Sequence, residues 1–263
     1  MPKGIMTRGG PVPPRCLLIT GASSGIGAAL AEAYAAPGVT LRLTGRDATR
    51  LAQVAYQCTA AGAVVETTVL DVTDAAAMAA TVLDWDAAVP FDLVIANAGI
   101  SAGSGAGLES EADLRQVTDI NVIGTINTLA PLLPRLTARQ QGHVAVMASL
   151  AGYRGLAGAA AYCASKAWVK AYGEALRLTL APLGVRVSVI CPGFVKSRIT
   201  DQNKFPMPFL MPAPRAAQII KSALAANRAR IAFPWPMAAA IHLIAALPAA
   251  WADRLLQRLP QKT

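Results

Sequence analysis

The chain has 263 residues, of which 54% are hydrophobic and 15% are charged, and its formal net charge is +9. This length is sufficient for one α/β domain with a buried core, so no second domain is required. The most apolar late stretch, residues 237–247, has 11 residues between two prolines, whereas a membrane-spanning helix needs ~20, so the composition argues against a transmembrane protein.

Short apolar runs alternate with helical stretches after residues 1–14, which carry no apolar run and are expected to be a flexible lead-in, not a secretory signal. The runs are predicted to be strands at 16–20, 39–44, 64–70, 93–96, 143–148, 185–191 and 230–233. The helices are predicted at 25–36, 48–62, 74–88, 112–139, 160–181 and 214–226. Because the runs are apolar throughout, both faces of each strand should be covered. The pattern predicts an α/β fold with a Rossmann-like, doubly wound sheet of seven parallel strands and helices on both faces.

We assign residues 15–235 to a Rossmann-like catalytic domain and residues 236–263 to an apolar and basic helical extension. A substrate loop, residues 198–214, is expected to cover the carboxyl ends of the strands, where ligands bind in such sheets. Its apolar side chains would form an adaptable lid suited to an apolar substrate: Phe205, Met207, Phe209, Leu210 and Met211. The alternative is that these side chains only anchor the loop to the core.

The first strand runs into Thr-Gly-Ala-Ser-Ser-Gly-Ile-Gly at residues 20–27 and then into a helix. Glycine permits the sharp turn and the close backbone approach that a pyrophosphate needs, and the helix N–H groups receive its charge. We therefore predict that a dinucleotide is bound by Gly21, Ser23, Ser24, Gly25, Ile26 and Gly27. A strand-to-helix turn of another α/β protein could also use these glycines.

The second strand ends in Gly-Arg-Asp, with Arg46 and Asp47 at its tip. An acidic side chain there binds the ribose 2′-hydroxyl of NAD, whereas an arginine accommodates the 2′-phosphate of NADP. Arg46 therefore favours NADP(H) over NAD(H). The alternative is that Arg46 is a solvated charge, and Asp47 can serve as the N-cap of the next helix.

Tyr162 and Lys166 are four residues apart in a predicted helix, so their side chains lie on one face. A free phenol has a pKa of about 10, and a neighbouring ammonium group stabilises the phenolate and lowers that pKa. Tyr162 can then act as general acid in carbonyl reduction and as general base in alcohol oxidation. By itself the pair also fits an ordinary solvated helix face.

Six motifs together resemble the short-chain dehydrogenase/reductases over roughly residues 15–200. They are the loop at 20–27, Asn97-Ala-Gly99, Asn121-Val-Ile-Gly124, Ser149, Tyr162-x-x-x-Lys166 and Pro192-Gly193. The order of the motifs and their positions after the predicted strands match this family, which makes the resemblance specific.

The resemblance implies catalytic roles for Asn121, Ser149, Tyr162 and Lys166. Ser149 would hold the substrate oxygen, Lys166 would also bind the nicotinamide ribose, and Asn121 would support a water that links the lysine to solvent. It further implies cofactor contacts for Asp71, Val72, Asn97, Gly99, Pro192, Gly193, Val195 and Ser197. Homo-oligomerisation, as a dimer or tetramer, is implied as well.

The sequence thus predicts a cytoplasmic, NADP(H)-dependent oxidoreductase that acts on a small-molecule carbonyl or alcohol. Two alternatives are a catalytically silent NADP(H)-binding regulator and a membrane-surface scaffold. The four cysteines lack CxxC spacing, and with only two histidines in the chain no metal site is expected. No nucleic-acid partner is expected either.

Basic residues concentrate in residues 196–263, which hold 10 Lys or Arg against 2 Asp or Glu. Trp251, Leu255 and Leu259 repeat at helical spacing beside a second row of Arg254, Arg258 and Lys262. Such a helix can lie at an anionic membrane surface, which gives the hypothesis of a peripheral membrane contact. The alternatives are packing on the core or on another subunit, and attraction of an anionic substrate or carrier.

Overall fold

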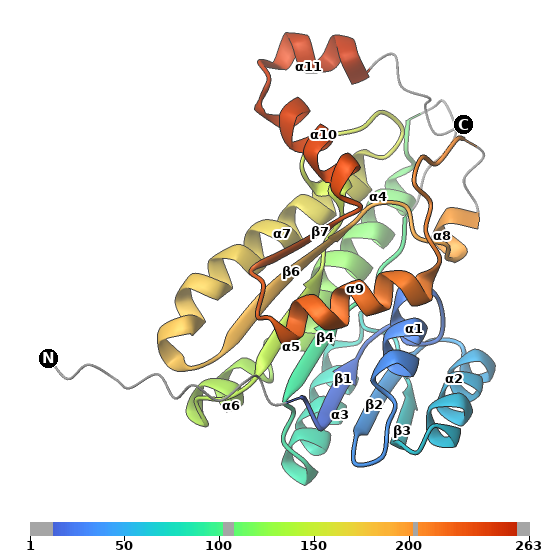
Figure 1. Cartoon of the computed structure of the whole chain (residues 1–263), viewed down its shortest axis with the longest axis vertical. Coiled ribbons are helices and arrows are strands. Elements are labelled where there is room, and N and C mark those ends of the chain that lie inside the picture. Colours follow the sequence, from blue (N-terminus) through green and yellow to red (C-terminus); the bar gives the residue numbers. More distant parts are fainter. Residues whose placement is uncertain (1–12, 102–107, 202–204, 257–263) are drawn as a thin grey trace, which may run out of the picture.

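The computed structural model describes residues 13–101, 108–201 and 205–256 (Figure 1). One seven-stranded sheet has the strand order β3-β2-β1-β4-β5-β6-β7, and each neighbouring pair is parallel. The strands are β1 (Cys16–Ile19), β2 (Thr40–Gly45), β3 (Val64–Val69), β4 (Leu93–Ala96), β5 (His143–Met147), β6 (Arg186–Pro192) and β7 (Arg230–Phe233). The predicted parallel sheet is confirmed.

The order of the strands reverses at β1, which lies between β2 and β4. At such a switch point the connections leave the sheet on opposite faces, and a crevice opens beyond the carboxyl ends of the strands. The loops after β1, β4, β5 and β6 all lie at this end of the sheet. Four of the six motifs begin in these loops or at the strand ends that lead into them: residues 20–27, Asn97-Ala-Gly99, Ser149 and Pro192-Gly193.

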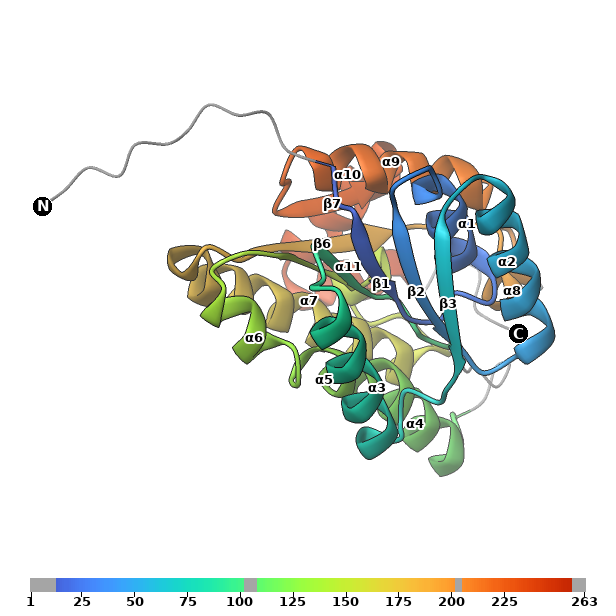
Figure 2. The ribbon, with the colours of Figure 1, turned by 90° about the horizontal axis from the view of Figure 1, so that it is seen from below.

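Helices cover both faces of the sheet (Figure 2). One core lies under α1 (Gly25–Tyr34), α2 (Ala48–Ala60) and α9 (Ala213–Ala225). The other lies under α3 (Ala75–Ala88), α5 (Gly124–Leu129), α6 (Leu133–Ala138) and α7 (Ala160–Leu180). Leu17 and Ile19 of β1 point into the first core and Leu18 into the second, as alternate side chains of a strand must. This two-sided burial explains why the central strands are apolar throughout. For the edge strand β3 the expectation of two covered faces is wrong, because four of its six residues are exposed.

The single helix predicted for residues 112–139 is wrong, because the structure divides this segment. It consists of α4 (Glu111–Thr118), a π-helical turn η1 (Asp119–Ile123), α5 and α6. Pro131 stands between α5 and α6, and Pro134 lies in the first turn of α6. Each lacks an N–H, and its ring crowds the carbonyl four residues earlier, so a regular helix is interrupted between α5 and α6. The π turn contains Asn121, whose side chain bonds to the backbone of Ile100.

Two shorter elements adjoin the carboxyl ends of the strands: η2 (Leu150–Gly152) after β5 and α8 (Arg198–Asp201) after β6. A third, η3 (Ala181–Leu183), joins α7 to the amino end of β6. Two helices then follow β7, α10 (Trp235–Ala246) and α11 (Ala249–Leu256), at the top of Figure 1. Among the described residues no helix is both long and apolar enough to cross a bilayer. Of the predicted amphipathic C-terminal helix, Leu259, Arg258 and Lys262 lie outside the described residues.

All four cysteines, Cys16, Cys58, Cys163 and Cys191, are buried and have free thiols. Burial disfavours the charged thiolate, and it raises the pKa of Cys16, Cys58 and Cys191 to about 11. These thiols therefore behave as small apolar side chains of the two cores.

Candidate active site

The glycine-rich loop between β1 and α1 is tightly packed. Gly21 has φ +66°, and a Cβ added to Gly27 would lie 2.3 Å from the carbonyl oxygen of Gly21, so a larger residue does not fit there. Asn97 fastens the loop, because its amide nitrogen donates to the carbonyl oxygens of Thr20 and Gly21 at 2.9 and 3.2 Å. Ser24 is the N-cap of α1, but its side chain makes no capping hydrogen bond. The first turn of α1 can therefore receive a phosphate.

At the tip of β2, Arg46 and Asp47 have different surroundings. The Asp47 carboxylate caps α2 by accepting from the N–H of Arg50 at 2.9 Å, and it pairs with the guanidinium of Arg50 at 2.7 Å. Arg46 is half exposed, 3.6 Å from Asp71. Burial opposes ionisation of Asp71, but hydrogen bonds from Thr73 and the charge of Arg46 outweigh it and lower the Asp71 pKa. The Arg46 guanidinium at this tip is therefore accessible, whereas the Asp47 carboxylate is bonded to the backbone and side chain of Arg50.

Ser149, Tyr162 and Lys166 meet beyond the ends of β5 and β6. Ser149 follows β5, and its Oγ accepts from the N–H of Ala151 at 3.1 Å. Lys166 Nζ donates to the carbonyl oxygen of Met147 at 2.8 Å and lies 5.8 Å from the centre of the Tyr162 ring. The side chains of Ser149 and Tyr162 share a hydrogen bond.

The pKa values of this cluster are governed first by burial. Burial raises the pKa of Tyr162 above its ordinary value, and the hydrogen bond with Ser149 offsets only part of that rise. Burial also lowers the pKa of Lys166 to about 8. The expectation that the lysine lowers the tyrosine pKa is therefore wrong for the protein alone. The Lys166 ammonium lies too far from the phenol ring to offset the effect of desolvation on the Tyr162 pKa, and it is bonded to the carbonyl of Met147.

Asn121 is fully buried behind this cluster. Its Oδ1 accepts from the N–H of Ile100 at 2.8 Å, while Nδ2 donates to the carbonyl of Ile100 and to Ser165 Oγ, each at 2.9 Å. Ser165 Oγ in turn donates to the carbonyl of Tyr162 at 2.8 Å. The side chain thus ties the loop after β4 to α7. Sequence reasoning did not select Ser165, whose place in the Y-x-x-x-K segment was the available signal.

A single cavity of about 1670 Å³ connects these parts, which exceeds the 300–1,000 Å³ typical of one ligand. It has room for a dinucleotide and a substrate. Most of the predicted site residues line it: Gly21, Ser23, Ser24, Gly25, Ile26, Arg46, Asp71, Val72, Asn97, Gly99, Ser149, Tyr162, Lys166, Pro192, Gly193, Val195 and Ser197. Gly27 and Asn121 do not line it, and they support the residues that do.

A sequence profile of the family described as short chain dehydrogenase matches residues 15–206, well over half of the chain. The chain belongs to the short-chain dehydrogenase family. Its activity class is that of an NAD(P)-dependent dehydrogenase or reductase.

Individual proteins agree with this assignment. An uncharacterized oxidoreductase of Myxococcus xanthus is 42% identical over 246 residues, which cover 93% of this chain and 97% of the relative. The structure of a short-chain dehydrogenase from Sphingobium yanoikuyae in complex with NADPH is 25% identical with a TM-score of 0.79. That of a short chain dehydrogenase/reductase from Burkholderia phymatum in complex with NAD is 27% identical with a TM-score of 0.81. Each of these alignments covers 96% of this chain and 98% of the other.

The substrate loop of this short-chain dehydrogenase differs in part from the prediction. Phe205 and Met207 line the cavity as expected. Phe209 and Leu210 are exposed and Met211 is buried, pairing with Val195 in a short parallel bridge. The loop therefore lines the cavity with Phe205 and Met207 and is anchored to the core by Met211. Each of the two interpretations of its apolar side chains holds for some of these residues.

A wall of the cavity that sequence reasoning missed comes from α10 and α11. Met237, Ile241 and Ile244 of α10 and Leu256 of α11 face the cavity of the dehydrogenase. The positions 237, 241 and 244 have helical spacing, but α10 is apolar at every position except His242, and its pattern alone did not distinguish an inner face. Arg50 also lines the cavity and was not selected.

Proposed function

We propose that this short-chain dehydrogenase transfers a hydride between NADP(H) and a carbonyl or alcohol with an apolar body. The observation that carries the proposal is that Ser149, Tyr162 and Lys166 line the same cavity as the glycine-rich loop. The proposed proton donor and the proposed dinucleotide site would thus share one cavity, as hydride transfer to a carbonyl requires.

The bound cofactor would supply or accept the hydride. Tyr162 would donate a proton to the carbonyl oxygen in reduction and accept one in alcohol oxidation. The hydroxyl of Ser149 would hold the same oxygen and stabilise its developing charge. Lys166 would favour the phenolate by its charge and bind the nicotinamide ribose. We assign Asn121 a positioning role, because its bonds join the loop after β4 to α7; its link to a proton-relay water stays a prediction.

The preference for NADP(H) is proposed from the tip of β2. Asp47 is occupied by the N-terminus of α2 and by Arg50, which leaves it poorly placed to accept from a ribose hydroxyl. Arg46, Asp47 and Arg50 all line the cavity. Because Arg50 is paired with Asp47, the half-exposed guanidinium of Arg46 is the group that suits a 2′-phosphate. The pyrophosphate would lie on residues 21–27, the adenine at Asp71 and Val72, and the nicotinamide near residues 192–197.

A panel of carbonyl compounds, each mixed with the protein and NADPH or NADH, tests the proposal. We expect NADPH oxidation with at least one apolar carbonyl and a higher kcat/KM with NADPH than with NADH. Tight NADPH binding without turnover on any substrate would instead favour the silent regulator. The relatives described above are dehydrogenases or oxidoreductases, and none of them supports the regulator or the scaffold.

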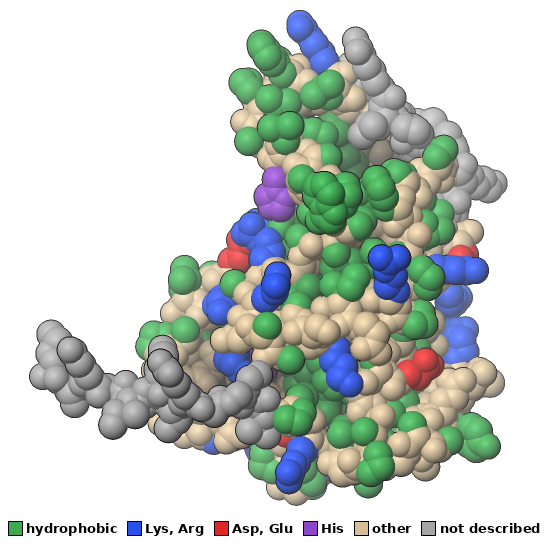
Figure 3. All heavy atoms as spheres, viewed as in Figure 1, with side chains coloured by type: hydrophobic (Ala, Val, Ile, Leu, Met, Phe, Trp, Pro, Cys, Tyr) green, Lys and Arg blue, Asp and Glu red, His purple; other side chains and the backbone are tan. Residues whose placement is uncertain are grey.

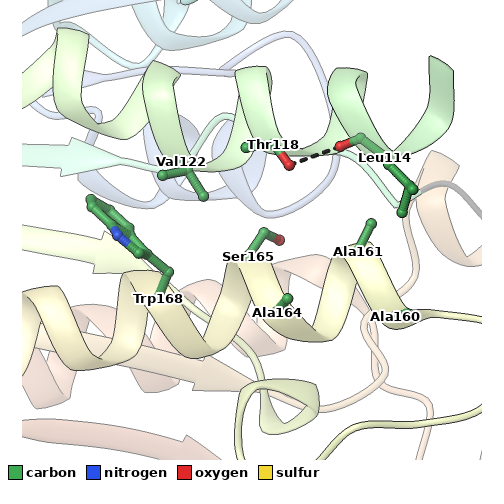
Figure 4. A pocket seen from close by; sticks show the side chains of 8 residues that line it. All are labelled: Leu114, Thr118, Val122, Ala160, Ala161, Ala164, Ser165 and Trp168. Carbon is green, nitrogen blue, oxygen red and sulfur yellow. Dashed lines mark hydrogen bonds between the residues drawn. The ribbon is translucent and has the colours of Figure 1, made fainter. Parts of the chain in front are cut away.

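We further propose a homodimer or homotetramer, built on a groove of about 460 Å³ between α4, the π turn and α7 (Figure 4). Its α7 side is formed largely by small side chains, which permit close helix packing: Ala160, Ala161, Ala164 and Ser165. Light scattering should give a mass of two or four chains. A mass of 27.2 kDa, that of one chain, would contradict the proposal.

We propose a cytoplasmic protein, and from its C-terminal extension we propose a peripheral contact with anionic membranes. Trp235, Leu243 and Trp251 are 78%, 68% and 64% exposed, and hydrophobic atoms gather over α10 and α11 (Figure 3). The full chain should co-sediment with anionic vesicles more than with neutral ones, and the control is a chain that ends at Pro236. Equal, negligible sedimentation with both would reject the contact.

A further inference from the structure

One face of α10 forms an apolar strip inside the cavity. Met237, Ile241 and Ile244 all line it, and the rise of 1.5 Å per residue spreads them over about 10 Å along the helix. Leu256 of α11 belongs to the same lining. Figure 1 shows both helices beyond the carboxyl end of β7. Ser149 follows the carboxyl end of β5 in the same parallel sheet, and it lines the cavity together with Tyr162. The strip therefore borders the substrate side of the cavity.

Other apolar groups share this side. Leu150 and Leu156 contribute from the segment after β5, and Phe205 and Met207 contribute from the substrate loop. The Phe205 ring packs edge-on against Phe194 at 5.9 Å between ring centres, which fixes it as part of the wall. An apolar substrate can thus be contacted from three chain segments at once.

Charged groups near the strip are paired or belong to another element. The Asp253 carboxylate lines the cavity on α11, and Arg154 holds it at 2.7 Å. Asp113 and Gln116 also line the cavity, but they belong to α4, and Arg198 lines it from α8. The α10 side is consequently unsuited to a charged substrate group and suited to hydrocarbon.

We propose that α10 and α11 form a channel for an extended alkyl chain attached to the reacting carbonyl, and that Ile241 sets the length of chain accepted. The substrate class is then medium- to long-chain ketones or aldehydes and the corresponding alcohols. This inference rests on the proposed function, since it concerns the body of the substrate on which that reaction occurs.

A homologous series of 2-ketones, from butanone to dodecanone, tests the channel with NADPH as the reductant. Each methylene that enters the channel should raise kcat/KM by up to about fourfold, which corresponds to ~0.8 kcal/mol. The rise should end at the length that fills the channel. A series without any rise, in a protein that reduces butanone, overturns the inference and leaves the proposed function intact.

Two tryptophan substitutions on the same helix provide the matched comparison. Ile241→Trp should abolish the gain from the longer chains, so that kcat/KM no longer rises from butanone to dodecanone, whereas Leu243→Trp, at a position 68% exposed, should keep the rise of the wild type. Ile241→Ala, which removes volume, should move the optimum to longer chains. NADPH binding confirms that each variant is folded. Equal effects of the tryptophans at 241 and 243 would count against the channel.

Calorimetric binding of the same ketones to the protein with NADP⁺ tests the channel without turnover. Affinity that increases with chain length, and loses this dependence in Ile241→Trp, supports it. If no carbonyl is reduced but this binding series holds, the proposed reaction fails and the channel stands. If binding does not depend on length, the channel fails whatever the activity.

Discussion

The guanidinium of Arg154 lies 2.7 Å from the carboxylate of Asp253, and this ion pair joins the segment after β5 to α11. Within the described part of α11, Ala252 is the buried residue, so the helix has little other packing. We expect Asp253→Asn to raise KM for a long-chain ketone about two- to fivefold with little change in Tm, since an exposed pair contributes at most about 1 kcal/mol.

Steady-state kinetics at low and high salt checks this prediction. The KM of the wild type should rise with salt, because salt screens the pair, and that of Asp253→Asn should not. Glu111→Gln is the control, since it breaks the exposed pair with Arg115 on α4. If the KM of Asp253→Asn and the KM of Glu111→Gln rise equally with salt, the pair between Arg154 and Asp253 does not hold the cavity wall in place.

Tyr162→Phe removes the proposed proton donor and retains the ring. We expect kcat to fall by about 10²–10⁴, the usual contribution of a positioned acid, while the Kd for NADPH changes little. Stopped-flow reduction and fluorescence titration measure the two quantities. Tyr56→Phe, at an exposed position, should leave both unchanged, and substantial activity in the Tyr162 variant would refute the assignment.

The pH dependence of carbonyl reduction should follow the ionisation of the Lys166 side chain. Its pKa is lowered to about 8, so it is charged below that pH and neutral above it, while the raised pKa of Tyr162 keeps the phenol protonated. We therefore expect kcat/KM, which reports the free enzyme, to be level below about pH 8 and to fall above it. Lys166→Arg should be less active at every pH but lack this fall, because arginine stays charged. A wild-type profile that is level well above pH 8 would contradict the prediction.

Arg46→Asp should move cofactor preference from NADPH towards NADH, because it replaces a phosphate partner by a hydroxyl acceptor. The ratio of the two kcat/KM values is the measurement. Asp47→Ala is the control: it removes the N-cap of α2 and should lower stability by about 1 kcal/mol without moving the ratio. A ratio that responds to Asp47 and not to Arg46 would reverse the roles proposed for them.

The sheet could be predicted because its signal is local. Leu17, Leu18 and Ile19 are each buried, two on one face of the sheet and one on the other, so a continuous apolar run marks the strand. The break between α5 and α6 was also readable, since Pro131 and Pro134 stand in the sequence. The π turn was not, because it depends on bonds between Asn121 and Ile100, which lie in separate segments.

The residues proposed to contact the cofactor could be predicted from motifs. The residues that hold them in position, and the cavity wall formed by α10 and α11, could not. Asp47 shows the difference: whether it binds ribose or caps a helix depends on Arg50. Ile241 and Leu243 are two residues apart in an apolar helix, and the fold places one against the cavity and leaves the other exposed. His242 between them is the only polar side chain of α10, and one polar position does not distinguish the inner from the outer apolar residues.

The burial of all four native thiols makes the chain a convenient host for site-specific chemistry. With pKa values of about 11 at Cys16, Cys58 and Cys191, these groups hold almost no thiolate at neutral pH, and the thiolate is the species that reacts with maleimides. A cysteine introduced by Leu243→Cys, on the exposed side of α10, would therefore be labelled selectively in the otherwise unaltered protein. A fluorophore at that position would report movements of α10 as a ketone enters.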